Sequence, residues 1–206
     1  MQDNIKNLIV DFGGVLIDLN RTRCVEAFEK LGLNNVEELI DPYRQQGLFL
    51  AFEQGNITTT EFRDGIRKLA GKKITDKQID AAWNSFLINI PSKKLDLLLS
   101  LRQHYVVYLL SNTNDIHWRW ACDNCFAYKG FRVEDYFEDI YLSYEMHCAK
   151  PDKEIFETLI AETGILPEES FFIDDAQSNC LTAEALGIKT YMPQAGEDWS
   201  HLFMEK

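Results

Sequence analysis

The sequence predicts an α/β fold, a doubly wound parallel sheet with an inserted all-helical domain. Short apolar runs alternate with helical patterns in the C-terminal half of the chain, as in parallel sheets that carry helices on both faces. Only helix signals occupy residues 18–90, a stretch far too long for an ordinary crossover. We therefore expect residues 18–90 to form a helical cap domain and residues 1–17 and 91–206 to form the core domain around the sheet.

Five apolar runs have the length and composition of buried strands. The predicted strands are Asn7–Phe12, Tyr105–Leu110, Ile140–Ser143, Phe171–Asp174 and Lys189–Met192.

Helix start signals are clear in the predicted cap. Thr58 with Glu61 and Thr75 with Gln78 both fit the capping box, in which each side chain binds a backbone N–H of the first turn. Gly71 stands where the helix between them should end. These signals predict a cap built from several short amphipathic helices.

Composition excludes several classes of protein. A net charge of -12 over 206 residues argues against a nucleic-acid surface, and no apolar stretch approaches the length of a membrane span. The N-terminus lacks the pattern of a signal peptide, so we expect a cytoplasmic protein that contacts neither nucleic acid nor membrane. Five cysteines, with one isolated Cys122-x-x-Cys125 pair, predict free thiols and no disulfide framework or zinc site. The sequence does not indicate an oligomeric state.

Polar residues follow the predicted strands, and in a parallel sheet these strand ends meet at one edge, where open α/β folds bind ligands. A short loop after the third strand adds a lysine. The residues expected at this edge are Asp11, Ser111, Asn112, Lys150, Asp174 and Asp175.

This set of residues suits phosphoryl transfer. The carboxylate of Asp11 can attack phosphorus and form an acyl-phosphate, which divides hydrolysis into two steps. Asp11 and Asp175 offer the hard oxygen ligands that Mg²⁺ prefers. The Ser111 hydroxyl and an amide of Asn112 can hold phosphate oxygens. Lys150 can bind another phosphate oxygen and keep Asp11 ionised.

The chain resembles the haloacid dehalogenase-like hydrolases over nearly its whole length. Four segments carry the resemblance: DFGGVL, LLSNTN, AKPDKEIF and FFIDDAQSN. It implies that Asp11 is the nucleophile, Ser111 a phosphate ligand, Lys150 a catalytic cation and Asp175 a metal ligand. It also implies a Rossmann-like core with a cap inserted after the first motif.

Three further residues have roles by the same resemblance. The backbone carbonyl of Gly13 corresponds to a metal ligand of the family. Asp174 is either a second ligand or a group behind the ligands. Asn179 lies one helical turn beyond Asp175, where it could orient Asp175 or Lys150, or serve as an ordinary helix residue.

Gly13 is also the departure from the family. Most phosphatases of the family carry an aspartic acid there that protonates the leaving group, and losing such an acid slows a reaction by about 10²–10⁴-fold. Asp18, His117 and His147 are possible replacements, each with a structural role as the simpler interpretation. The D-x-G pattern looks most like a subgroup that includes sugar-1-phosphate phosphatases, whose leaving groups need less acid.

The leading hypothesis is a Mg²⁺-dependent phosphatase for a small phosphorylated metabolite, for which we expect a sugar phosphate, acting through an aspartyl-phosphate. One alternative is a metal-independent 2-haloacid dehalogenase, which the Asp174–Asp175 pair disfavours. Another is a catalytically weak binding or regulatory protein, which only Gly13 favours.

Overall fold

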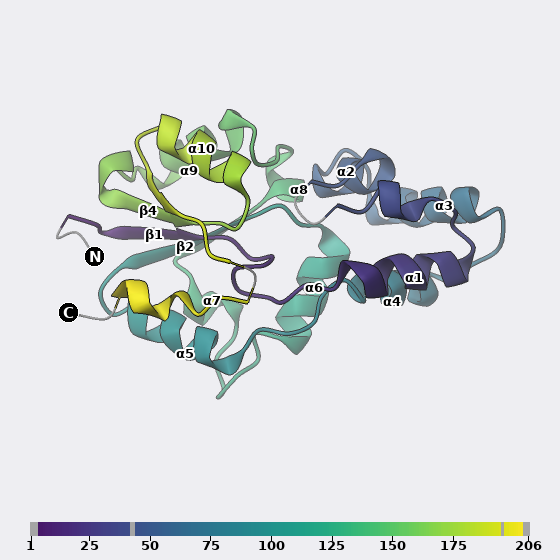
Figure 1. Cartoon of the computed structure of the whole chain (residues 1–206), viewed down its shortest axis with the longest axis horizontal. Helices are drawn as coiled ribbons and strands as arrows, with labels where there is room; N and C mark the ends of the chain where they lie inside the picture. The colour runs from purple at the N-terminus through teal and green to yellow at the C-terminus, as the bar shows by residue number, and fades with distance from the viewer. Residues whose placement is uncertain (1–3, 42–43, 195, 204–206) are drawn as a thin grey trace.

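The computed structural model describes residues 4–41, 44–194 and 196–203, and in these residues five parallel strands form one sheet (Figure 1). The strand order is β3-β2-β1-β4-β5, so the chain reverses its direction of winding at the central strand, β1. The predicted α/β class and all five strands are confirmed, each end within two residues. The strands are β1 (Asn7–Val10), β2 (Val106–Ser111), β3 (Asp139–Leu142), β4 (Ser170–Ile173) and β5 (Lys189–Tyr191).

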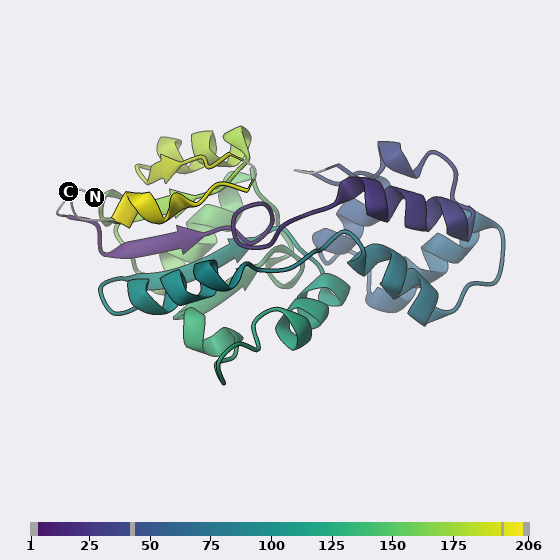
Figure 2. The same cartoon turned by 60° about the horizontal axis from the view of Figure 1, so that its bottom comes forward.

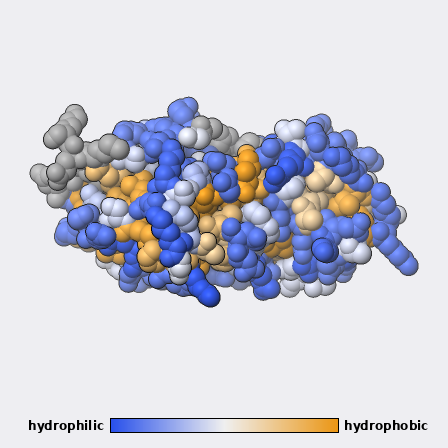
Figure 3. Space-filling model, turned by 90° about the horizontal axis from the view of Figure 1, so that it is seen from below, coloured by the Kyte–Doolittle hydropathy of each residue, from blue (hydrophilic) through white to orange (hydrophobic). Residues whose placement is uncertain are grey.

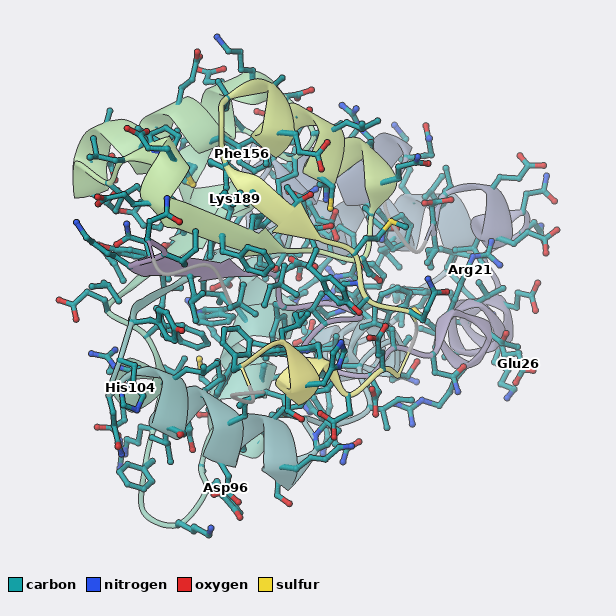
Figure 4. All side chains as sticks on the ribbon, turned by 60° about the vertical axis from the view of Figure 1, so that its left-hand side comes forward. Arg21, Glu26, Asp96, His104, Phe156 and Lys189 are labelled. Atoms are coloured by element: carbon teal, nitrogen blue, oxygen red, sulfur yellow. The ribbon has the colours of Figure 1, made fainter. Side chains whose placement is uncertain are left out.

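Helices cover both faces of the sheet because successive side chains of β1 point to opposite faces. Leu8 and Val10 belong to one hydrophobic cluster, which includes α5 (Ser92–Leu101). Ile9 belongs to a second cluster, with α9 (Lys153–Thr163) and α10 (Gln177–Ala185). Figure 4 shows the two layers, with Phe156 of α9 above the sheet and Asp96 of α5 below it. The sheet is therefore buried on both sides.

The remaining helices and turns lie around the sheet and in the loops that join its strands. They are α6 (Asp115–Asn124), α7 (Val133–Tyr136), α8 (Ser143–Met146) and the 3-10 turns η2 (Pro167–Glu169) and η3 (Trp199–Phe203).

The segment between β1 and α5 folds into helices that lie beyond the carboxyl ends of the strands in both views (Figures 1 and 2). Both predicted capping boxes are present, and Gly71 ends its helix in the left-handed conformation. Aromatic rings fill the space between these helices, with Phe49 and Trp83 at 4.9 Å between centroids. The helices are α1 (Arg21–Leu31), η1 (Val36–Glu38), α2 (Gly47–Glu53), α3 (Thr59–Ala70) and α4 (Asp76–Asn84).

Two extended segments connect these helices to the sheet and run antiparallel. The N–H of Asp18 donates to the carbonyl of Asn89, and the N–H of Ile88 donates back to the carbonyl of Asp18, at 3.0 and 2.8 Å. These crossing points lie near the expected boundaries of the cap at residues 18 and 90. The division into two domains stays a prediction.

Two predictions from composition can be compared with the structure. All five cysteines are free thiols, and burial raises the pKa of Cys122 to about 11 and also raises that of Cys125. No helix in the described part of the chain is long and apolar enough to cross a membrane. Hydrophilic side chains surround small apolar patches on the face in Figure 3. The cytoplasmic location stays a prediction.

Candidate active site

The strand order brings the predicted site residues together beside the reversal point at β1. Val10 pairs with Ile173, and the N–H of Asp11 donates to the carbonyl of Ile173 at 2.9 Å, so the chain positions after β1 and β4 are adjacent. A cavity of about 60 Å³ lies at this edge. Asp11, Gly13, Asn112, Lys150, Asp175 and Asn179 are among the residues that line it.

Lys150 holds this edge together. Its Nζ donates to Asp11 Oδ1 at 2.7 Å, to Asp174 Oδ2 at 2.6 Å and to the carbonyl of Leu110 at 2.8 Å. Burial lowers the pKa of Lys150, but Asp11 and Asp174 outweigh burial, and the pKa lies above its usual value. Because an ammonium group has three N–H donors, a phosphate oxygen can reach Lys150 only in exchange for one of these acceptors.

Asp174 is a partner of Lys150, fully buried and saturated with hydrogen bonds. Its Oδ1 accepts from the N–H of Ala176 at 2.8 Å, and Asn179 Nδ2 lies 3.0 Å from both carboxylate oxygens. Together with Lys150, these donors occupy the roughly four lone-pair directions of a carboxylate. This arrangement favours the interpretation that Asp174 supports neighbouring site residues by hydrogen bonds and does not bind the metal itself. Asn179 Nδ2 hydrogen-bonds Asp174, the partner of Lys150, and not Asp175 or Lys150 itself. A role of Asn179 in orienting Lys150 stays a prediction.

Asp175 lies over Gly14, a glycine to which the sequence analysis assigned no role. Gly14 has φ +71°, and a Cβ built on it would lie 2.0 Å from Asp175 Oδ2. A side chain at this position would therefore push the carboxylate away. The need for Gly14 is physical, because only glycine adopts this φ without strain while leaving the space empty.

The electrostatics of this edge fit a divalent cation. Oxygens of Asp11, Asp174 and Asp175 all lie within 4.8 Å of one another. Burial raises the pKa of Asp11 to about 8, with Lys150 opposing the shift and the charges of Asp174 and Asp175 adding to it. Burial, followed by the charge of Asp174, raises the pKa of Asp175 to about 6. One ammonium does not balance three carboxylates, and a hard cation on Asp11 and Asp175 would remove the excess charge.

The residues expected to bind phosphate have different positions. The side chain of Asn112 is engaged with the backbone of Lys150, accepting from its N–H and donating to its carbonyl, both at 2.8 Å. These two hydrogen bonds fix its side-chain amide, so its backbone amide and the second N–H of Nδ2 are left for phosphate. Ser111 is buried at the end of β2 and is not among the described residues that line the cavity. Its contact with phosphate stays a prediction, as does metal binding by the carbonyl of Gly13.

Of the three candidate proton donors, only His117 lines the cavity. Its Nε2 lies 3.0 Å from the carbonyl of Trp83, its Nδ1 lies 3.3 Å from Asn114 Nδ2, and burial lowers its pKa to about 4. A neutral ring with both nitrogens engaged is a poor acid. His147 is exposed, and Asp18 belongs to the paired connecting segments.

The cap side of the cavity carries a carboxyl group that the sequence analysis missed. Glu53, at the end of α2, lines the cavity and is only 7% exposed. Glu53 lies one turn after Phe49 and next to Phe52, on the buried side of the helix. This position was the available signal, because a glutamate on an apolar helix face is uncommon.

Comparison with known proteins agrees with this geometry. The sequence model of the haloacid dehalogenase-like hydrolases matches residues 5–187. The chain is 40% identical over 195 residues, 95% of both chains, to a D-ribitol-5-phosphate phosphatase of Bacteroides thetaiotaomicron. It is 62% identical to another enzyme of this family from the same species, solved with magnesium and inorganic phosphate, with a TM-score of 0.93 over 97% of this chain and 100% of that one. A related hydrolase of Porphyromonas gingivalis is 39% identical, with a TM-score of 0.91 over 98% of this chain and 100% of that one.

Proposed function

We propose that this chain, which belongs to the haloacid dehalogenase-like hydrolases and is a Mg²⁺-dependent phosphatase, hydrolyses the phosphate monoester of a pentitol or a similar sugar. The observation that carries the proposal is the buried Lys150 between Asp11 and Asp174, beside the carboxylate of Asp175. This network supports a nucleophilic carboxylate next to a cation site. The 40% identical relative, which acts on D-ribitol 5-phosphate, supports the substrate class.

The reaction proceeds through an aspartyl-phosphate on Asp11. An oxygen of Asp11 forms a bond to phosphorus while the bond to the substrate oxygen breaks, and water then releases phosphate from Asp11 in a second step. Lys150 keeps Asp11 aimed and favours its ionised form, and Asp174 with Asn179 keeps Lys150 in place. Bound Mg²⁺, held by Asp11, Asp175 and the carbonyl of Gly13, would offset the negative charge shared by phosphate and carboxylates.

The substrate class differs from the first expectation in one respect. The D-x-G pattern favoured sugar 1-phosphates, which stays a prediction, whereas the substrate of the curated relative is a 5-phosphate. In a pentitol 5-phosphate the leaving group is an ordinary primary alcohol. The metal-free dehalogenase alternative is not carried forward, because the three clustered carboxylates would serve no purpose in it.

The test is phosphate release from p-nitrophenyl phosphate and from a panel of ribitol 5-phosphate, glucose 1-phosphate and glucose 6-phosphate, with Mg²⁺ or with EDTA. We expect Mg²⁺-dependent turnover, with the highest kcat/KM on ribitol 5-phosphate. Asp11→Asn should lose about 10⁴-fold or more, whereas Asp123→Asn, the same change at an exposed site of α6, should retain activity. Undiminished turnover by Asp11→Asn would refute the mechanism, and a preference for either glucose phosphate would refute the substrate class.

A further inference from the structure

The proposed reaction requires a proton that the first motif does not supply. The alkoxide released from a pentitol phosphate is a strong base, so it leaves readily only when an acid protonates it as the bond breaks. Gly13 has no side chain for this purpose. The donor must therefore come from another part of the cavity.

Glu53 lines the same cavity as Asp11 but comes from the helical insertion, whereas Asp11 follows β1 of the sheet. In phosphoryl transfer the attacking and leaving oxygens lie roughly in line across phosphorus. With Asp11 attacking from the strand ends, the substrate oxygen departs toward the insertion. The carboxyl of Glu53 is on that side.

The carboxyl of Glu53 has no other task in the part of the chain that the structure describes. No side chain or backbone N–H there donates a hydrogen bond to it, and no cation pairs with it. Other polar groups that line the cavity, such as Lys150, Asn112 and His117, have hydrogen-bond partners. The Glu53 carboxyl oxygens are not among the fully enclosed polar atoms that lack a partner, so they open into the cavity, where a ligand can contact them.

The backbone around Glu53 is fixed to the sheet. The Ser143 hydroxyl lies 2.6 Å from the carbonyl of Glu53 and also contacts Thr113, accepting from its N–H at 3.0 Å. Two residues on, Gly55 approaches the carbonyl of Tyr144 so closely that a Cβ would lie 2.0 Å from it. These contacts hold the end of α2 against the carboxyl end of the sheet.

We propose that Glu53 is the general acid that replaces the missing side chain at position 13, an inference that rests on the proposed phosphatase function. As the phosphorus–oxygen bond breaks, its electron pair goes to the substrate oxygen, which takes the carboxyl proton of Glu53 and leaves as a neutral alcohol. The resulting Glu53 carboxylate then takes a proton from the water that attacks the aspartyl-phosphate. Phosphate is released, Asp11 is restored as a carboxylate, and Glu53 is again protonated.

The protonation of Glu53 agrees with this role. Burial, with a smaller contribution from the charge of Asp11, raises the pKa of Glu53 to about 8. The charged groups that share the cavity with it are Asp11, Asp175 and Lys150, and His117 is neutral. The proton is therefore present at neutral pH before substrate binds.

The test compares wild type, Glu53→Gln and the matched control Glu38→Gln, an exposed residue of η1, on three substrates. Ribitol 5-phosphate has a poor leaving group and hydroxyls, ethyl phosphate has a poor leaving group without hydroxyls, and p-nitrophenyl phosphate has a good leaving group. For a general acid, Glu53→Gln should lose about 10²–10⁴-fold in kcat/KM on both alkyl phosphates. Its kcat/KM on p-nitrophenyl phosphate should stay at the wild-type value, because kcat/KM reports departure of the leaving group and not the later step in which Glu53 takes a proton from water. Glu38→Gln should resemble wild type throughout.

Two other patterns would overturn the proposal. A loss of kcat/KM on ribitol 5-phosphate alone would make Glu53 a ligand for substrate hydroxyls. An equal loss of kcat/KM on all three substrates would make Glu53 a structural residue. Neither pattern affects the proposed function, which is tested separately by the Mg²⁺-dependent turnover of the wild type and its loss in Asp11→Asn.

Discussion

Asp11 and Glu53 are both buried carboxyl groups in one cavity, but their surroundings differ. Asp11 accepts a hydrogen bond from Lys150 at 2.7 Å and belongs to a network anchored by Asp174 and Asn179. Glu53 faces the cavity without a cation or a hydrogen-bond donor among the described residues. The partner, not the residue type, decides which form of a carboxyl is stable. Burial raises the pKa of both groups to about 8. A divalent cation on Asp11 and Asp175 would lower the pKa of Asp11 and favour its anion, whereas Glu53 has no such partner and keeps its proton.

Removing the ammonium group of Lys150 should abolish the difference between the surroundings of Asp11 and Glu53 and cause the largest loss of stability. Lys150→Met leaves Asp11 and Asp174 buried without their partner, and breaking a buried ion pair in this way costs about 3–5 kcal/mol. We expect a matching loss in the free energy of unfolding by urea at pH 7, together with loss of activity. Lys153→Met, which removes an exposed lysine of the same region, should change stability little. Equal stability of the two variants would show that Lys150 is not needed to neutralise the buried carboxylates.

Glu53→Gln should have the opposite effect on stability, because it removes a buried acid that has no cation. The pKa of Glu53 is raised on folding, so the folded state binds its proton more tightly, and stability falls as the pH rises from about 4.5 towards 8. The variant should equal wild type near pH 4 and exceed it by roughly 2–4 kcal/mol at pH 8. Urea unfolding at both pH values measures the difference. A variant less stable than wild type at pH 8 would contradict the assignment of Glu53 as protonated.

A smaller change is expected from Gly14→Ala, which tests whether Asp175 must stay in place beside Asp11 to bind Mg²⁺. The new Cβ would collide with Asp175 Oδ2, 2.0 Å away, and φ at this position is +71°. Displacing Asp175 should weaken Mg²⁺ binding by about 10–100-fold, the usual effect of disturbing the support of a ligand. Titration of Mg²⁺ in the activity assay, with calorimetry as an independent measurement, would detect the change. Gly164→Ala, also at positive φ but with open space around it, controls for backbone strain alone, and similar Mg²⁺ affinity in both variants would exclude the steric cause.

Much of the fold and half of the site followed from local patterns. The strands were predicted because parallel strands buried on both faces are short apolar runs. Since the carboxyl ends of parallel strands meet at one edge of the sheet, Asp11, Lys150 and Asp175 were then expected there. The hydrogen bonds of Asn112 and the saturation of Asp174 depend on side-chain geometry across elements distant in sequence. Glu53 escaped notice because its role depends on how the insertion packs against the sheet. Gly14 escaped because its neighbour Asp175 lies 161 positions away in the chain.

The small size of the cavity links bond cleavage to enclosure of the substrate. Its volume of about 60 Å³ is well below the roughly 300–1,000 Å³ typical of small-molecule sites, so a pentitol phosphate enters only if the contacts that hold the end of α2 against the sheet open. That movement would carry Glu53 away from Asp11. An open enzyme then has a nucleophile without a proton source, and a closed one has both. Bond cleavage would be confined to the interval in which the substrate is enclosed, and the opening step would set the upper limit of turnover.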